Sequence, residues 1–195
     1  PRWLTATIHD PSQSMENITG IVVPQQPSAA EENRAKDQAK AQVETITTWH
    51  TAFMFCQNER QDFECLHSDV QSFLKDEMDW PIAGQEDIDW ELESPEYDNI
   101  CDAIREMVLE DALDVQVRTE WHNLGDDPEL GQYKILLCTG GPAVQLRGDL
   151  CGGQPEHAYL EFQDWFTSWE PYEDTTEEQD AALLWYADQF YWEQA

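Results

Sequence analysis

The chain has 195 residues, with 41 Asp and Glu against 10 Lys and Arg, so its net charge is −31. A charge of this size and sign excludes nonspecific binding to DNA, RNA or anionic lipid, because the field of the protein repels them. The 41% of hydrophobic residues and the nine tryptophans exclude a disordered acidic tail, since they supply ample material for a core. The partners expected from this composition are basic surfaces or cations.

The cysteines and the hydropathy pattern indicate a compartment. The five cysteines are an odd number without a Cys-x-x-Cys pair, and Cys56, Cys101 and Cys138 stand in apolar patterns typical of small core residues. The sequence shows no signal-peptide pattern and no apolar run near 18 residues. We therefore expect a cytoplasmic protein with reduced cysteines.

The N-terminal region is expected to begin with a short strand pair, because residues 2–8 alternate and residues 18–23 are β-branched. Ser28 and Glu31 then have the spacing of a capping box. No Gly or Pro occurs between them and Cys56, which predicts a long helix. Its apolar stripe consists of Ala35, Ala39, Val43, Ile46, His50 and Phe53.

Two further helices are predicted in the middle of the chain. Residues 61–78 have Phe63, Leu66, Val70, Phe73 and Leu74 at helical spacing. An acidic loop with two tryptophans follows, and residues 95–113 form the next helix, with Ser94 as N-cap and Pro95 at the first position. The apolar face of this helix comprises Ile100, Cys101, Ile104, Met107 and Val108.

Beyond residue 113 the hydrophobic period changes from 3.6 to 2, which predicts strands over 115–121, 133–138, 143–146 and 157–165. Residues 139–142 and 148–155 are read as turns, so the four strands form an antiparallel meander. Thr175 and Glu178 form a second capping box, which opens a terminal helix with Leu183, Leu184, Ala187, Phe190 and Tyr191 on its apolar side. The predicted class is α+β, with a mainly helical region over 1–94 and an acidic α+β domain over 95–195.

The helix over 95–113 carries an unbroken row of carboxylates, Asp98, Asp102, Glu106 and Glu110, at intervals of four residues. Like charges at this spacing destabilise a helix by about 0.2–0.5 kcal/mol per pair, and only Arg105 offers relief within the helix. A mixture of charges would keep the helix equally soluble. We infer that the row serves a partner that prefers negative charge.

The acidic residues form two blocks in which aromatic residues are interleaved. The first includes Asp87, Asp89 and Glu91 of the loop that precedes this helix, and these extend the row as candidate phosphate mimics. The second is the alternative partner-binding site and comprises Asp164, Trp165, Trp169, Glu170, Glu173 and Asp174. The competing interpretation is a solvated acidic face that serves solubility alone.

No motif indicates catalysis, a cofactor or a metal. Cys65 and His67 have no second Cys/His pair at zinc spacing, and the acids of residues 87–93 do not match the glycine and terminal Glu of a calcium loop. The turn at 139–142 lies between strands and contains no Lys, unlike a phosphate-binding loop. We expect no catalytic residue, metal or cofactor.

The C-terminal half contains the segments ILLCTGGPAVQLRGDL, AYLEFQDWF and LLWYADQFYW, and it resembles uncharacterised proteins carried by phages and other mobile elements. In size, charge and compactness the whole chain is similar to acidic anti-CRISPR and anti-restriction proteins that imitate DNA. The likeness is one of class, and no functional residue is carried over from it. It implies an inhibitor that acts in the cytoplasm of an infected bacterial host.

The residues and the resemblance lead to one hypothesis, a stoichiometric inhibitor without turnover. It would imitate DNA and block target-DNA binding by a CRISPR effector, with a multisubunit Cascade-type complex as the first choice and a restriction enzyme as the alternative. The expected partner is a basic nucleic-acid-binding protein, with no direct binding to nucleic acid or membrane. Two rival classes stay open: a tryptophan-rich adaptor that binds another protein, and an unrecognised enzyme or metal-binding protein.

Overall fold

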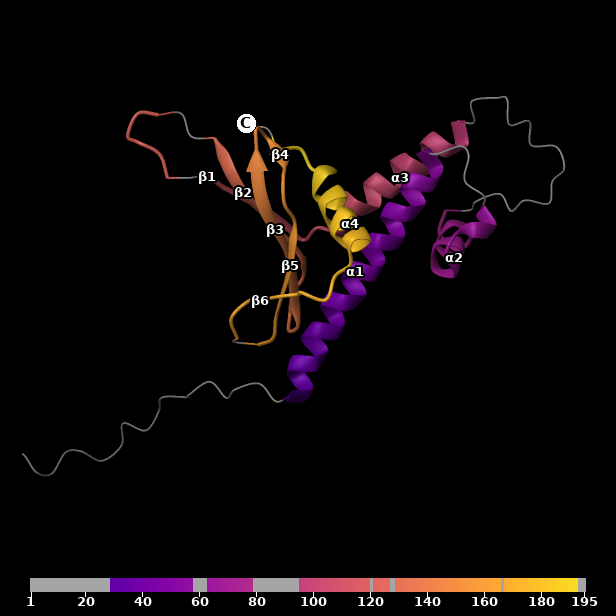
Figure 1. Ribbon diagram of the computed structural model, residues 1–195, viewed down its shortest axis with the longest axis horizontal. Coiled ribbons are helices and arrows are strands. Elements are labelled where there is room, and N and C mark those ends of the chain that lie inside the picture. The colour runs from indigo at the N-terminus through magenta and orange to yellow at the C-terminus, as the bar shows by residue number, and fades with distance from the viewer. Residues whose placement is uncertain are drawn as a thin grey trace, which may run out of the picture.

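The computed structural model describes residues 29–57, 63–78, 95–119, 121–126, 129–165 and 167–192. Within these ranges, α-helices cover one side of an antiparallel sheet (Figure 1). This arrangement confirms the predicted α+β class. The predicted strand pair near the N-terminus lies outside the described residues. Across the described residues, none of the helices has the length and apolar character needed to cross a membrane.

The longest element is α1 (Ala29–Gln57), which confirms the predicted long helix. Its buried side includes Ala35, Ala39, Val43, Ile46 and Phe53 of the predicted stripe. His50 is half-buried rather than fully enclosed, with its ring 5.2 Å from the ring of Trp185. Burial lowers the pKa of His50, because the charged imidazolium is disfavoured away from water.

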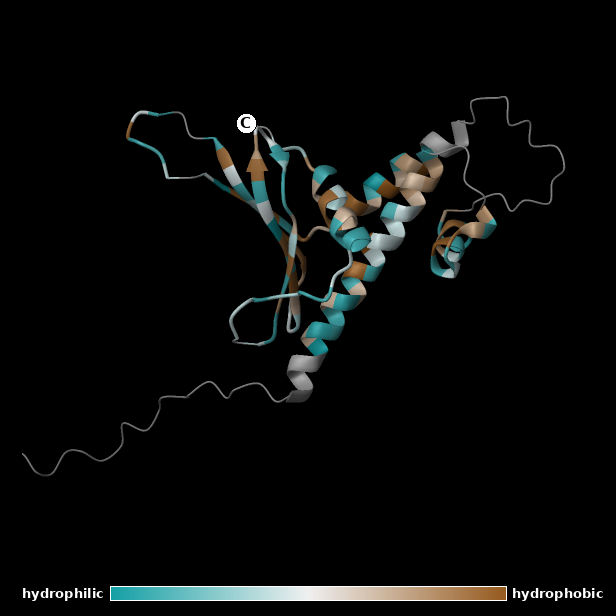
Figure 2. Ribbon diagram, in the orientation of Figure 1, coloured by the Kyte–Doolittle hydropathy of each residue, from teal (hydrophilic) through white to brown (hydrophobic). Residues whose placement is uncertain are grey.

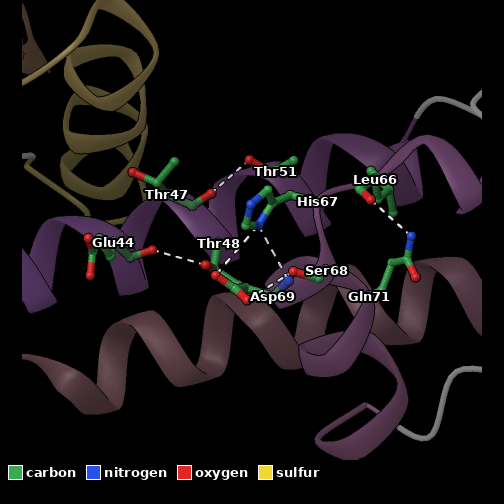
Figure 3. A network of polar contacts seen from close by, with 9 residues as sticks. All are labelled: Glu44, Thr47, Thr48, Thr51, Leu66, His67, Ser68, Asp69 and Gln71. Atoms are coloured by element: carbon green, nitrogen blue, oxygen red, sulfur yellow. Dashed lines mark hydrogen bonds and ion pairs between the residues drawn. The ribbon is translucent and has the colours of Figure 1, made fainter.

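The helix predicted over 61–78 is wrong as a single element. The chain instead forms a 3-10 turn, η1 (Phe63–Cys65), and a separate helix, α2 (Ser68–Asp76). The break occurs because His67 has extended backbone angles and caps α2, with Nδ1 accepting from the Asp69 N–H at 3.4 Å (Figure 3). The Gln71 amide donates to the carbonyl of Leu66 at 2.9 Å and so satisfies the end of the first segment.

Helix α3 spans Pro95–Asp111, in agreement with the predicted helix over 95–113. It packs on α1. Ile100, Cys101, Ile104 and Val108 of its predicted apolar face are buried, and Met107 is half-buried. Figure 2 shows hydrophobic and hydrophilic residues on the same helix in both α3 and α4, as amphipathic packing requires. The predicted N-cap, Ser94, lies outside the described residues.

The sheet is antiparallel, with strand order β1-β2-β3-β5-β6, and β4 pairs with β3. The four longer strands are consecutive neighbours, as the predicted meander requires, and the predicted turn at 139–142 joins β2 to β3. The prediction of four strands missed β4 and β6, because a two-residue strand shows no alternation. The bounds are β1 (Asp114–Thr119), β2 (Leu130–Cys138), β3 (Ala143–Cys151), β4 (Gln154–Pro155), β5 (Tyr159–Gln163) and β6 (Glu170–Pro171).

Strand β3 extends through Gly148, a residue that the sequence analysis placed in a turn. Gly148 pairs with Tyr133 across the sheet. A Cβ atom at this position would lie 1.8 Å from the carbonyl oxygen of His157 and 2.5 Å from the Tyr133 hydroxyl. The Tyr133 hydroxyl donates to that carbonyl at 2.7 Å. The glycine therefore reflects a close approach of backbone and ring, and no turn is needed to explain it.

Helix α4 (Glu177–Asp188) begins one residue later than predicted. Thr176 is the N-cap, and it exchanges hydrogen bonds with Gln179 in a capping box, at 3.0 and 3.3 Å. The predicted pair, Thr175 and Glu178, has the same spacing, so the sequence offers two registers. The predicted apolar side is also partly wrong, since the helix ends at Asp188 and Tyr191 beyond it is 79% exposed.

The strands contribute buried residues on the side that faces the helices, including Tyr133, Ile135, Leu146 and Leu160. These belong to one hydrophobic cluster with buried residues of α1, α2, α3 and α4. The predicted domain boundary after residue 94 lies outside the described residues, and the helices described on its two sides contribute to this same cluster. Among the described residues, no helix lies over the opposite face of the sheet (Figure 1), which is called the open face below.

Candidate functional site

Helix α3 is fixed from its inner side. Ile104 and Val108 are completely buried, and the Cys101 thiol approaches the carbonyl oxygen of Phe53 at 3.8 Å. At the C-terminal end, the Tyr186 hydroxyl and the Gln42 amide both donate to Oδ2 of Asp111, at 2.9 and 3.0 Å. Contacts with α1 and α4 therefore hold the rotation of α3 about its own axis, and its outer side faces solvent.

The outer side of α3 presents Asp102, Glu106 and Glu110, all exposed and each one helical turn from the next. Carboxylates at this spacing lie about 6 Å apart along the helix axis. Arg105 is the only basic residue of α3, and its guanidinium donates to Asp102 at 2.9 Å while lying 4.9 Å above the ring of Phe53. We call these three carboxylates the α3 stripe.

Several residues predicted to belong with the stripe are not described. Asp98 lies in α3 by its backbone, and its side chain is outside the described set. Asp87, Asp89 and Glu91 of the preceding loop also lie outside the described residues. The structure thus describes three of the four predicted helix carboxylates as exposed neighbours.

Asp111 is the carboxylate of α3 that faces the interior. Burial raises its pKa above the ordinary 3.8, whereas the hydrogen bonds from Tyr186 and Gln42 oppose that rise by favouring the charged form. The sequence contained a signal for this difference, because Asp111 is out of register with the four-residue spacing of the α3 stripe. Its role is to hold helices together.

The second predicted block does not form one exposed surface. Asp164 is only 9% exposed, and its carboxylate accepts the Trp165 N–H at 2.8 Å, so it shapes the turn after β5. Asp174 forms an ion pair with Lys36 of α1 at 2.5 Å, which raises the pKa of that lysine. Trp165, Glu170 and Glu173 are exposed, and Trp169 is half-buried. Part of this block is therefore committed to structural contacts.

Of the described cysteines, Cys65 and Cys151 are exposed and the others are buried or half-buried. Cys56 and Cys101 are buried as predicted, and burial raises the pKa of the Cys56 thiol to about 12, which keeps it protonated. Cys138 is half-buried, and burial raises its pKa as well. Among the residues described, no three His, Cys, Asp or Glu side chains are grouped so as to hold a metal ion.

The sequence analysis missed the basic side chains of the open face. Arg118, Lys134 and Arg147 lie on β1, β2 and β3 and line one hollow of about 320 Å³ together with Trp169. A signal was present, because Lys134 and Arg147 alternate with the buried residues of their own strands. Only the strand register, which the sequence does not display, brings these three bases to one place.

Comparison with known proteins identifies no relative: no family model, curated protein or solved structure matches the chain.

Proposed function

We propose that this protein is a stoichiometric acidic inhibitor that imitates DNA and occupies a basic nucleic-acid-binding channel of another protein. The observation that carries the proposal is the α3 stripe: Asp102, Glu106 and Glu110 stand exposed and evenly spaced on a helix whose opposite side is fully buried. Their separation of about 6 Å per step is close to that of successive phosphates along a strand.

The electrostatics of the described residues favour this role. DNA-binding proteins obtain much of their affinity from Lys and Arg contacts to phosphates and from counterion release. A rigid row of carboxylates offers the same contacts without a nucleic acid, and a net charge of −31 steers association with a basic channel. Arg105 engages only Asp102, so Glu106 and Glu110 have no ion pair within the described residues.

As the target we propose a CRISPR effector, with a multisubunit Cascade-type complex first and a restriction enzyme as the alternative. Both present a channel that binds duplex DNA through its backbone, which is the surface that such a mimic would fill. No turnover is involved, so inhibition should be complete at one inhibitor per channel.

A second candidate, the protein-binding adaptor, has an observation in its favour. Leu109 and Leu113 near the end of α3, with Val115 and Val117 on the edge strand β1, are 42–58% exposed. An exposed apolar strip of this kind is typical of a protein contact that does not depend on charge. The two candidates therefore differ in the effect of salt on partner binding.

The test uses three immobilised proteins: the unchanged chain, a variant with Asp102, Glu106 and Glu110 changed to Lys, and a control with Glu129, Glu156 and Asp188 changed to Lys. Both variants change the net charge equally, and the control residues are exposed and lie outside α3. Each is incubated with bacterial lysate, washed at low and then high salt, and the eluates are identified by mass spectrometry.

The proposal expects a basic nucleic-acid-binding complex that elutes with salt from the unchanged chain and the control, and at least 100-fold less of it from the α3 variant. With the purified complex, the unchanged chain should also displace labelled target DNA. A partner that resists high salt would favour the adaptor. Equal capture by all three proteins would refute the α3 stripe as the binding site.

A further inference from the structure

The open face of the sheet concentrates positive charge in a protein that has little of it. Of the ten Lys and Arg in the chain, Arg118, Lys134 and Arg147 line one hollow of about 320 Å³, and no acidic residue among those described lines it. The other lining residues are polar or aromatic apart from Val117, namely Gln116, Gln132, Tyr133, Gln145 and Trp169.

The strand register makes this arrangement costly for the sheet. Lys134 of β2 pairs directly with Arg147 of β3, and Gln116 of β1 pairs with Lys134 on its other side. Like charges directly opposite each other destabilise an antiparallel pair. The chain has 41 acidic residues from which a favourable partner could have been drawn. Glu161 pairs with Arg147 at 3.2 Å, so Lys134 is the cation of the two that no described carboxylate neutralises.

The acidic residues that neighbour the hollow are already engaged. Glu161 accepts from the Arg147 guanidinium at 3.2 Å and from the Gln145 amide at 2.6 Å. Asp149 accepts from the Gln132 amide at 2.9 Å and faces His157 at 3.6 Å, and Asp114 accepts from the Gln116 amide. Lys134 and Arg118 have no ion pair within the described residues, so their charges are available to an anion.

One residue that lines the hollow has a buried acceptor without a donor. The Gln132 amide nitrogen is used by Asp149, and its Oε1 atom is buried without a hydrogen-bond partner among the described residues. An acceptor left in this state costs about 1–3 kcal/mol unless a donor reaches it. The atom is closed to solvent, so it is a local cost to the sheet and offers no contact to a ligand in the hollow.

Trp169 is the tryptophan that lines the hollow. It lies immediately before β6 and lines the same hollow as residues of β1, β2 and β3, so it reaches across the open face. An indole ring at this place offers a stacking surface for a flat heteroaromatic ring. Two chemical features thus meet in the hollow: the cations Lys134 and Arg118, and an aromatic surface.

We propose that the open-face hollow binds a nucleoside monophosphate. The phosphate contacts Lys134 and Arg118, and the base stacks on Trp169. The volume of about 320 Å³ lies at the small end of ligand sites, which suits one nucleotide. A longer strand would extend over the carboxylates around the hollow and be repelled. This site is independent of the proposed inhibition through α3.

The test measures binding of AMP, CMP, GMP and UMP to the full chain by isothermal titration calorimetry at 0.15 M salt, where carboxylates more than about 8 Å away are screened. At least one nucleotide should bind saturably, and inorganic phosphate or the matching nucleoside should bind at least tenfold more weakly. Lys134→Ala and Arg118→Ala should each weaken nucleotide binding about tenfold or more. Trp169→Ala should weaken it by a similar factor.

Lys75→Ala is the matched control, because it removes one charge from a half-buried lysine on α2, away from the sheet. It should leave binding unchanged. Circular dichroism and thermal unfolding of each variant confirm that the fold is retained, and Lys134→Gln serves if Lys134→Ala does not fold. Absence of saturable binding, equal binding of inorganic phosphate, or equal loss in the Lys75 variant would each overturn the proposal.

Discussion

The α3 stripe and the open face of the sheet use charge in opposite ways. On α3, Asp102, Glu106 and Glu110 are exposed, and among them only Asp102 forms an ion pair within the described residues, with the exposed Arg105. On the open face, most charged or amide side chains near the hollow are half-buried or bonded to a neighbour, as in the Arg147–Glu161–Gln145 group, and Arg118 is the exposed exception. The helix carries excess charge with little internal support, whereas the sheet holds a small number of charges in a bonded network.

This difference separates charge that can be removed from charge that the fold needs. An exposed ion pair contributes little to stability because water and salt screen it. A half-buried carboxylate without its donor leaves an unsatisfied group in a less polar environment. The contrast predicts that neutralising the α3 stripe changes binding and spares the fold, and that breaking the open-face network or the inner contacts of α3 weakens the fold.

The largest expected effect on stability comes from the inner side of α3. Tyr186→Phe removes the donor to Asp111 and leaves a half-buried carboxylate with one hydrogen bond fewer. We expect a loss of about 1.5–3 kcal/mol in the free energy of unfolding at pH 7, measured by urea denaturation. If the loss is no larger than that for an exposed helix residue, the inner contact does not fix α3.

The pH dependence of this variant has a definite sign. The Tyr186 hydrogen bond lowers the pKa of Asp111, so its removal raises that pKa further above 3.8. A carboxyl with a higher pKa in the folded state binds protons more tightly there, so stability is lost as the pH rises through that pKa. The cost of Tyr186→Phe should therefore shrink as the pH falls and Asp111 becomes protonated.

A smaller effect is expected on the open face. Arg147→Ala removes the guanidinium from Glu161, whose side chain is 18% exposed, and should cost about 1 kcal/mol after allowance for screening. Arg118→Ala removes the same charge from an exposed residue of β1 and should cost no more than about 0.5 kcal/mol. Chemical denaturation of both variants distinguishes them, and equal costs would show that the Arg147–Glu161–Gln145 group does not support the sheet.

Much of the fold could be predicted because its elements have strong periodicity. The buried positions of α1 and α3 repeat at helical spacing, and those of β2 and β3 alternate over several residues. The wrong predictions of helix boundaries fall where the sequence pattern is short or where two candidate caps have the same spacing. The break at His67 depends on side-chain hydrogen bonds, and the α4 capping box has two candidate pairs at the same spacing.

The candidate sites were predictable to different degrees for a physical reason. The α3 stripe is local in sequence, so its exposed side follows from the buried side of the same helix. The open-face hollow combines residues from three strands and a loop, and only the strand register brings Lys134 opposite Arg147. The sequence predicts Asp164 as part of an acidic surface, but its side chain is buried and accepts a hydrogen bond from the next backbone N–H.

The smallest effect tests the premise on which the α3 stripe rests. Glu106 stands four residues from both Asp102 and Glu110, so Glu106→Gln removes two repulsive pairs of about 0.2–0.5 kcal/mol each. The variant should be more stable by about 0.5 kcal/mol, a shift of about 0.25 M in the urea midpoint for a slope near 2 kcal/mol/M.

Glu129→Gln removes the same charge from an exposed loop residue and controls for net charge. At 1 M salt the Debye length is about 3 Å, so the repulsion is screened and the gain in stability should disappear. A Glu106 variant that gains no more than the Glu129 variant would mean that the stripe costs the helix nothing, and solubility alone would then explain it.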